Sequence, residues 1–140
     1  MSDTPEQAGA EPVDPKIQEL AGRVFDAARA GDAATLVTYV DAGVPVDLTN
    51  EKGDTLVMLA AYHGHPTAVA ALVERGADVD RLNDRGQSPL AGALFKGEDD
   101  VVRVLVAAGA DPDAGHPTPV DTARMFGRED LLELLESRSD

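Results

Sequence analysis

Residues 53–80 read GDTLVMLAAYHGHPTAVAALVERGADVD, and the rest of the chain repeats their pattern. Moved by thirty-three positions, the stretch recurs without a gap at residues 86–113 as GQSPLAGALFKGEDDVVRVLVAAGADPD. Glycines match glycines in the two copies, and a Gly-Ala-Asp ending closes each of them. A repeat period of roughly 20–50 residues is typical of stacked architectures. The sequence therefore predicts units that stack and bury a continuous core between neighbours.

Each copy contains two short apolar patterns at helical spacing, separated by a break at a glycine. We expect helices near residues 55–63, 66–75, 88–96 and 98–108. Pro66 and Pro89 stand in the first turns of two of these helices, where the N–H that proline lacks has no partner within the helix. Each unit is thus predicted to be a pair of helices.

Further units flank the two copies. The first helix begins near residue 16, and the apolar face expected for it consists of Ile17, Leu20, Val24, Phe25 and Ala28. A second helix follows and ends near residues 41–43. The last unit is three residues shorter than the others, around residues 114–116, and its final helix covers about 129–136. Polar outer faces on both end units suit caps of a stack.

Polar arms connect the units at residues 48–53 and 81–86, and both end in glycine. Such segments suit an extended arm with a tight turn. Asn50 and Asn83 hold equivalent places in the two arms. We expect each of these asparagine side chains to bond the backbone two residues further on.

The chain is acidic: its 140 residues carry a formal net charge of -14, with 26 Asp and Glu against 12 Lys and Arg. This charge disfavours nucleic acid and anionic lipid and favours basic or neutral partners. The absence of cysteine excludes disulfides and thiol chemistry. An Arg-, Ala- and Asp-rich composition hints at a GC-rich bacterial genome, and a cytoplasmic location is expected.

Residues 1–15 are polar and acidic and contain almost nothing to bury. They predict a disordered tail without signal-peptide features. The alternative is a second binding segment.

The repeat resembles the ankyrin family. The resemblance rests on the period and on TLVMLAAYHGH at 55–65, SPLAGALFKGE at 88–98, TPVDTARMFGR at 118–128, and the GADVD and GADPD endings. It implies an all-α helical repeat solenoid of about four helix-turn-helix units with short hairpin arms. The repeat domain would cover residues 16–140, with units at about 16–49, 50–82, 83–114 and 115–138.

The chain departs from the family pattern T-P-L-H-x-A-A-x-x-G-H in two respects. Met58, Ala91 and Asp121 replace the family's histidine, and Leu56 replaces a proline. Local hydrogen bonds lost in this way are worth about 1 kcal/mol each. The glycine positions and the apolar spacing are kept, so the expected fold is unchanged.

Candidate chemical groups are few. His63 and His65 are two residues apart and do not share a helix face, and His116 is distant in sequence, so no metal site is expected. The resemblance implies a structural role for His65. The acids at 98–100 and 129–130 open expected helices, where they meet the positive end of the helix dipole. We expect no catalytic residues and no cofactor.

The resemblance implies that the arm tips and the ends of the first helices of each unit line a concave groove, and Arg29 and Ala30 are among these lining residues. The candidate partner-binding residues are Tyr62, His63, Phe95, Lys96, Met125, Phe126, Glu51, Lys52, Asp54, Asp84, Arg85 and Gln87. Tyr62 and Phe95 are thirty-three positions apart, so stacking predicts a short ladder of rings on neighbouring units. The alternative is that Phe95 and Phe126 turn inward and fill gaps between helices.

These patterns predict a non-enzymatic, monomeric protein–protein interaction module, such as an adaptor, scaffold or inhibitor. Its partner would carry a basic or apolar element. The alternative is a self-assembling structural or stress-linked accessory protein, and an enzyme is the least favoured class.

Overall fold

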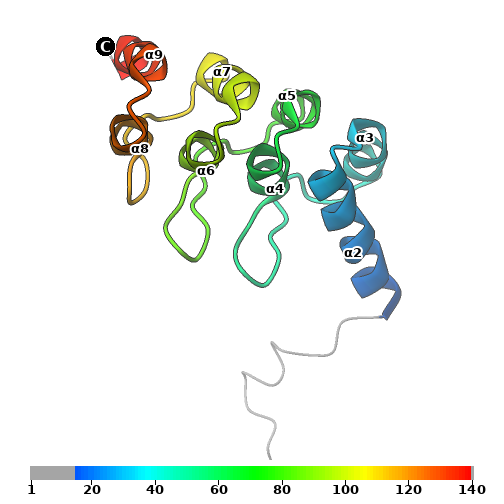
Figure 1. The fold of residues 1–140 in the computed structure, drawn as a ribbon. Helices are drawn as coiled ribbons and strands as arrows, with labels where there is room; N and C mark the ends of the chain where they lie inside the picture. Colours follow the sequence, from blue (N-terminus) through cyan, green and yellow to red (C-terminus); the bar gives the residue numbers. More distant parts are fainter. Residues whose placement is uncertain (1–14, 140) are drawn as a thin grey trace, which may run out of the picture.

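The computed structural model describes residues 15–139, with side chains through residue 137 (Figure 1). Most of the tail expected at residues 1–15 lies outside this range, and Pro15 begins the first helix. Eight helices make up the described part, and their bounds are α2 (Pro15–Ala30), α3 (Ala33–Asp41), α4 (Leu56–Tyr62), α5 (Pro66–Glu74), α6 (Pro89–Lys96), α7 (Asp99–Ala107), α8 (Pro119–Met125) and α9 (Glu129–Ser139).

The helices form two rows, as Figure 1 shows. Helices α2, α4, α6 and α8 pack successively in one row, and α3, α5, α7 and α9 pack in the other. Each helix of the first row also contacts the next helix in sequence, which completes a two-helix unit. The arms extend from the first row, and the last of them is the shortest (Figure 1). The predicted solenoid is therefore confirmed, and no helix of residues 15–139 combines the length and apolarity needed to cross a membrane.

The core is one continuous apolar seam that runs through all four units. Its largest fully buried side chains come from every unit in turn, and among them are Leu36, Leu56, Leu72, Leu90 and Leu131. No unit has a separate core, because each helix buries its apolar face against the adjacent unit.

Ile17 lies differently from what the sequence pattern predicts for the first helix. It was placed on the buried face, but its side chain is 57% exposed. The first half of α2 extends beyond the second unit, as Figure 1 shows, so Ile17 lies outside the apolar seam between the units. Burial of this face begins with Leu20, which is half-buried, and is complete at Val24.

Three helices of the first row start in the same way. The hydroxyl oxygens of Thr55, Ser88 and Thr118 each accept a hydrogen bond from the backbone N–H three residues later, over 3.0–3.1 Å. Such caps satisfy an N–H that has no partner within the helix. The residues donating these bonds are Met58, Ala91 and Asp121, which replace the family's histidine. The cap therefore forms without the imidazole.

The arms are built on asparagine, as expected. Asn50 Oδ1 accepts hydrogen bonds from the amides of Lys52 and Asp54, at 2.9 and 3.0 Å. Asn83 Oδ1 does the same in the next arm for Arg85 and Gln87, at 3.0 Å each. A single antiparallel bridge, Thr49 to Thr55, closes the first arm.

Hydrogen bonds also join each arm and each helix ending to the next. The Asp84 amide donates to the Lys52 carbonyl at 3.0 Å, and Asn83 Nδ2 donates to Asp54 Oδ1 at 2.8 Å. At the helix endings, Asp80 Oδ1 accepts from the amide of Asp111 at 2.8 Å. These bonds hold the arms in register along the stack.

Arg128 joins the last unit to α7. Its guanidinium donates two hydrogen bonds to the Asp99 carboxylate, at 3.0 and 2.7 Å, and contacts Asp130 at 3.2 Å. Two parallel bonds of this kind are the strong geometry for an arginine–carboxylate pair. Asp99 and Asp130 also lie in the first turns of α7 and α9, as their sequence positions predict.

We expect Arg128→Gln to destabilise the protein in a pH-dependent way. The hydrogen bonds from Arg128 lower the pKa of Asp99 and of Asp130 below the usual 3.8. A lowered carboxyl pKa adds stability that is present above the ordinary pKa and is lost as pH falls through the folded-state value. The difference in free energy of unfolding between wild type and variant should be constant from about pH 7 to 5 and shrink below about pH 4. Urea denaturation at stepped pH measures it.

Arg103→Gln is the matched control, since Arg103 makes one 3.5 Å contact with the exposed Asp100. It should destabilise the protein less than Arg128→Gln at neutral pH. An Arg128→Gln effect that stays unchanged down to pH 3 would contradict the assigned role of the ion pair.

Candidate functional site

A concave cavity of about 210 Å³ opens where the first two arms meet the first-row helices α2 and α4. The arms contribute backbone and charged residues, and the helices contribute an aromatic and aliphatic floor. Its lining consists of Arg29, Asn50, Glu51, Lys52, Asp54, Met58, Leu59, Tyr62, His63 and Arg85. The cavity thus collects six of the predicted partner-binding residues: Glu51, Lys52, Asp54, Tyr62, His63 and Arg85.

Tyr62 lies at the end of α4, and its ring contacts two other side chains. The Lys96 ammonium from the next unit lies 4.9 Å from the Tyr62 ring centroid, a distance at which a cation and an aromatic ring attract. The His63 ring meets Tyr62 edge-on, with centroids 5.7 Å apart. Partial desolvation lowers the pKa of His63 below its usual 6.5, and the nearby charges of His65, Arg29 and Lys96 act in the same direction.

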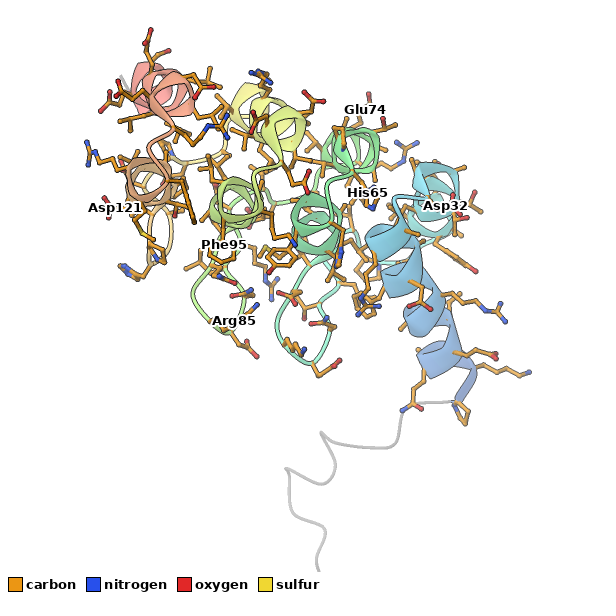
Figure 2. All side chains as sticks on the ribbon, viewed as in Figure 1. Asp32, His65, Glu74, Arg85, Phe95 and Asp121 are labelled. Atoms are coloured by element: carbon orange, nitrogen blue, oxygen red, sulfur yellow. The ribbon has the colours of Figure 1, made fainter. Side chains whose placement is uncertain are left out.

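The rings do not form the expected ladder of Tyr62 and Phe95. Phe95 pairs with Phe126, at 5.8 Å between centroids and in an edge-to-face arrangement, while Tyr62 is covered by Lys96. The inward alternative is wrong as well, since these two phenylalanines are 54% and 47% exposed. Figure 2 shows Phe95 at α6, on the side from which the arms extend.

The rings pair diagonally for a reason of helix geometry. With the three-residue shortening of the last unit, Phe95 corresponds to Tyr62, and Phe126 corresponds to Lys96. Side chains on a helix lean toward its N-terminus, so a residue covers the turn before its own Cα. Lys96 accordingly reaches back to Tyr62, and Phe126 reaches back to Phe95, one position earlier in the preceding unit. Exposed Met125 lies beside this pair in sequence.

Asp54 and Gln87 have internal bonds that the sequence did not reveal. Asp54 is only 8% exposed, and its carboxylate accepts the bond from Asn83 Nδ2. Gln87 Oε1 accepts from the same nitrogen at 3.3 Å. Asp54 therefore forms part of the cavity floor, in contrast to the exposed Glu51 and Asp84.

Sequence reasoning missed Met58 and Leu59 as lining residues. They precede Tyr62 by four and three positions, so the helical period places them on its face. This spacing was the available signal, but neither residue is among the predicted partner-binding residues. Asn50 was likewise read as a turn residue alone, although it also lines the cavity.

His65 lies apart from the cavity. Its Nε2 is 2.7 Å from the carbonyl oxygen of Arg29 in the preceding unit, so the ring links two units, as its sequence position predicts. Within residues 15–139, no three histidine or carboxylate side chains gather as metal ligands.

Comparisons with known proteins agree with the fold. A family model described as ankyrin repeats, in three copies, matches residues 24–116. A segment of 65 residues is 42% identical to the ankyrin repeat protein PA3287 of Pseudomonas aeruginosa, and it covers 46% of this chain and 36% of that protein. The crystal structure of the human ASB11 ankyrin repeat domain has a TM-score of 0.72 and 28% sequence identity to this chain. That match covers 84% of this chain and 54% of the human one, so the chain spans about half or less of these relatives.

Proposed function

Since the chain belongs to the ankyrin repeat family, whose members are generally protein–protein interaction modules, we propose that it binds a partner protein in its concave groove. The module acts by binding, as an adaptor, scaffold or inhibitor, and performs no catalysis. It works as a monomer, as the polar outer faces of its first and last units favour.

The observation that carries the proposal is a group of apolar side chains at the ends of the first-row helices, of which one lines the cavity and three are exposed. We name Tyr62, Phe95, Met125 and Phe126 the groove cluster. Phe95, Met125 and Phe126 are among the few large apolar side chains exposed in the described residues. Aromatic residues and methionine are enriched in binding interfaces, and aromatic residues often contribute most of the binding energy. A preformed groove also has little conformational freedom to lose on binding.

The partner offers an apolar element to the groove cluster. The sequence also suggested a basic element, because of the net charge of -14. In about 0.1 M salt, however, exposed charges act over only about 10 Å. The charge of the bound element therefore depends on the residues of the groove rather than on the distant acids.

Affinity purification from the native cell tests the proposal. Tyr62→Ala together with Phe95→Ala removes two rings from the groove cluster. Hot-spot residues cost about 2 kcal/mol or more each on truncation, so affinity should fall at least about 100-fold and the recovered partner should fall to background. Ile17→Ala, which removes an exposed apolar side chain on α2, is the matched control and should recover the partner fully.

Circular dichroism verifies that the variants are folded. A partner recovered equally by the double variant would place binding outside the groove. An empty wild-type lane, with sedimentation that depends on protein concentration, would instead support self-assembly.

A further inference from the structure

Several arginines outside the cavity are bound to carboxylates of this chain, whereas Arg81 has no carboxylate oxygen of the described residues within 4.0 Å. Arg75 lies 3.0 Å from Asp41, and Arg128 lies 2.7 Å from Asp99. Lys52, Arg85 and Lys96 differ from them. Within the described residues, no carboxylate oxygen lies within 4.0 Å of the cationic nitrogens of these three side chains.

All three of these cations lie around the concave side. Lys52 and Arg85 line the cavity from two successive arms, and Figure 2 shows Arg85 on its arm. Lys96 lies over Tyr62, which lines the same cavity. Arg29 adds a fourth positive charge from the end of α2, although it also contacts Asp26 at 3.1 Å.

The acids of the groove do not outnumber these cations. Glu51 and Asp84 are exposed, and the carboxylate of Asp54 is buried and accepts a hydrogen bond from Asn83. With Arg29 and its partner Asp26 both counted, the groove has four cations and four acids, whereas the whole chain has 12 and 26. This local balance of charge differs from the large excess of acids over the whole chain.

The exposed aromatic side chains lie next to one of these cations. Phe95 and Phe126 form an exposed pair next to Lys96. The cavity of about 210 Å³ is smaller than the roughly 300–1,000 Å³ of typical small-molecule sites. It suits one or two side chains of a larger partner rather than a whole small ligand.

We infer that the groove binds an acidic peptide segment of a partner protein that carries at least one aromatic or aliphatic side chain. The carboxylates of the segment meet Lys52 and Arg85, and its apolar side chain packs against Phe95 and Phe126. Complementary charge suppresses wrong partners and fixes the register of the bound segment. The inference rests on the proposed function, and it reverses the basic partner suggested by the net charge.

Selection from a library of random 12-residue peptides displayed on phage tests the inference. The full chain is immobilised at pH 7 in 0.15 M NaCl, and a parallel selection uses Lys52→Glu with Arg85→Glu. The matched control is Arg23→Glu with Arg103→Glu, which changes the net charge equally at two exposed positions outside the cavity. Fluorescence anisotropy with labelled copies of the enriched peptides then measures affinity.

The expected peptides have a negative net charge and an aromatic or aliphatic residue. The matched control should bind them within about twofold of wild type, and Lys52→Glu with Arg85→Glu should weaken binding at least tenfold. Enrichment of basic or neutral peptides, no enrichment above bare beads, or undiminished binding by the groove variant would each overturn the inference.

The same peptides separate this inference from the proposed function. Basic peptides that lose affinity for Tyr62→Ala with Phe95→Ala would overturn the acidic preference and leave the groove as the binding site. Peptides of any charge that bind this double variant undiminished would count against the groove itself.

Discussion

Leu90→Ala should lower the free energy of unfolding by about 3 kcal/mol. Leu90 is 0% exposed and lies in α6, which packs against both α4 and α8 in the middle of the stack. Truncation removes apolar contacts and leaves a cavity that the rigid neighbouring helices fill only partly. Total stabilities of small domains are about 5–15 kcal/mol, so the loss is a large fraction. Urea denaturation followed by circular dichroism measures it.

Ile17→Ala provides the contrast within the same fold. The sequence pattern places Ile17 on a buried helix face, but the structure exposes it, so the expected cost is within about 0.5 kcal/mol. If the two substitutions had equal effects, the seam between units would not be the main source of stability. If Ile17→Ala alone were costly, α2 would pack against something beyond the described residues.

Gly31→Ala should cost about twice as much as Gly97→Ala, although the two backbones are alike. Their φ angles are +74° and +72°, in the left-handed region, where a side chain costs roughly 1–2 kcal/mol. A Cβ on Gly97 meets nothing within 4 Å, whereas one on Gly31 falls 2.5 Å from His65 Cγ. Moving the ring away breaks the contact between His65 and the Arg29 carbonyl, which adds about 1 kcal/mol.

A double-mutant cycle isolates the contribution that comes from displacing the His65 ring. On a His65→Ala background, Gly31→Ala should cost only what Gly97→Ala costs in the wild-type chain, because the ring is gone. Thermal and urea unfolding of the variants provide the comparison. Equal costs for both glycines in the wild-type chain would show that the ring moves aside freely.

The period and the apolar spacing are sufficient to predict the stacked helix pairs. Asn50 and Asn83 identify the arm turns, because their turn chemistry is local. Ile17 could not be assigned in this way, since helical spacing shows which residues share a face but not where the neighbouring helix ends. That endpoint is a tertiary property.

Six of the residues that line the cavity were predictable, but their contacts were not. A thirty-three-residue period shows that Tyr62 and Phe95 are equivalent, yet side-chain direction decides which residues touch. Phe126 therefore came to pair with Phe95, and Lys96 with Tyr62. The burial of Asp54 follows from the approach of Asn83 on the next arm, which is twenty-nine residues away in sequence. A local sequence pattern does not predict a contact between residues so far apart in the chain.

The diagonal pairing has a consequence for how such a chain grows. Each such contact joins residues at the end of one first-row helix to the preceding unit, so it depends on both units. Consider a tandem duplication of residues 83–115, which adds one repeat. The Lys96 of the second copy would lie over the Phe95 of the first copy, and Phe126 would pack against the Phe95 of the second copy. One added repeat would thus create one new contact between a lysine and an aromatic ring and would preserve the pair of rings in the last units. The row of side chains at the ends of the first-row helices would lengthen in its interior, and its end would stay unchanged.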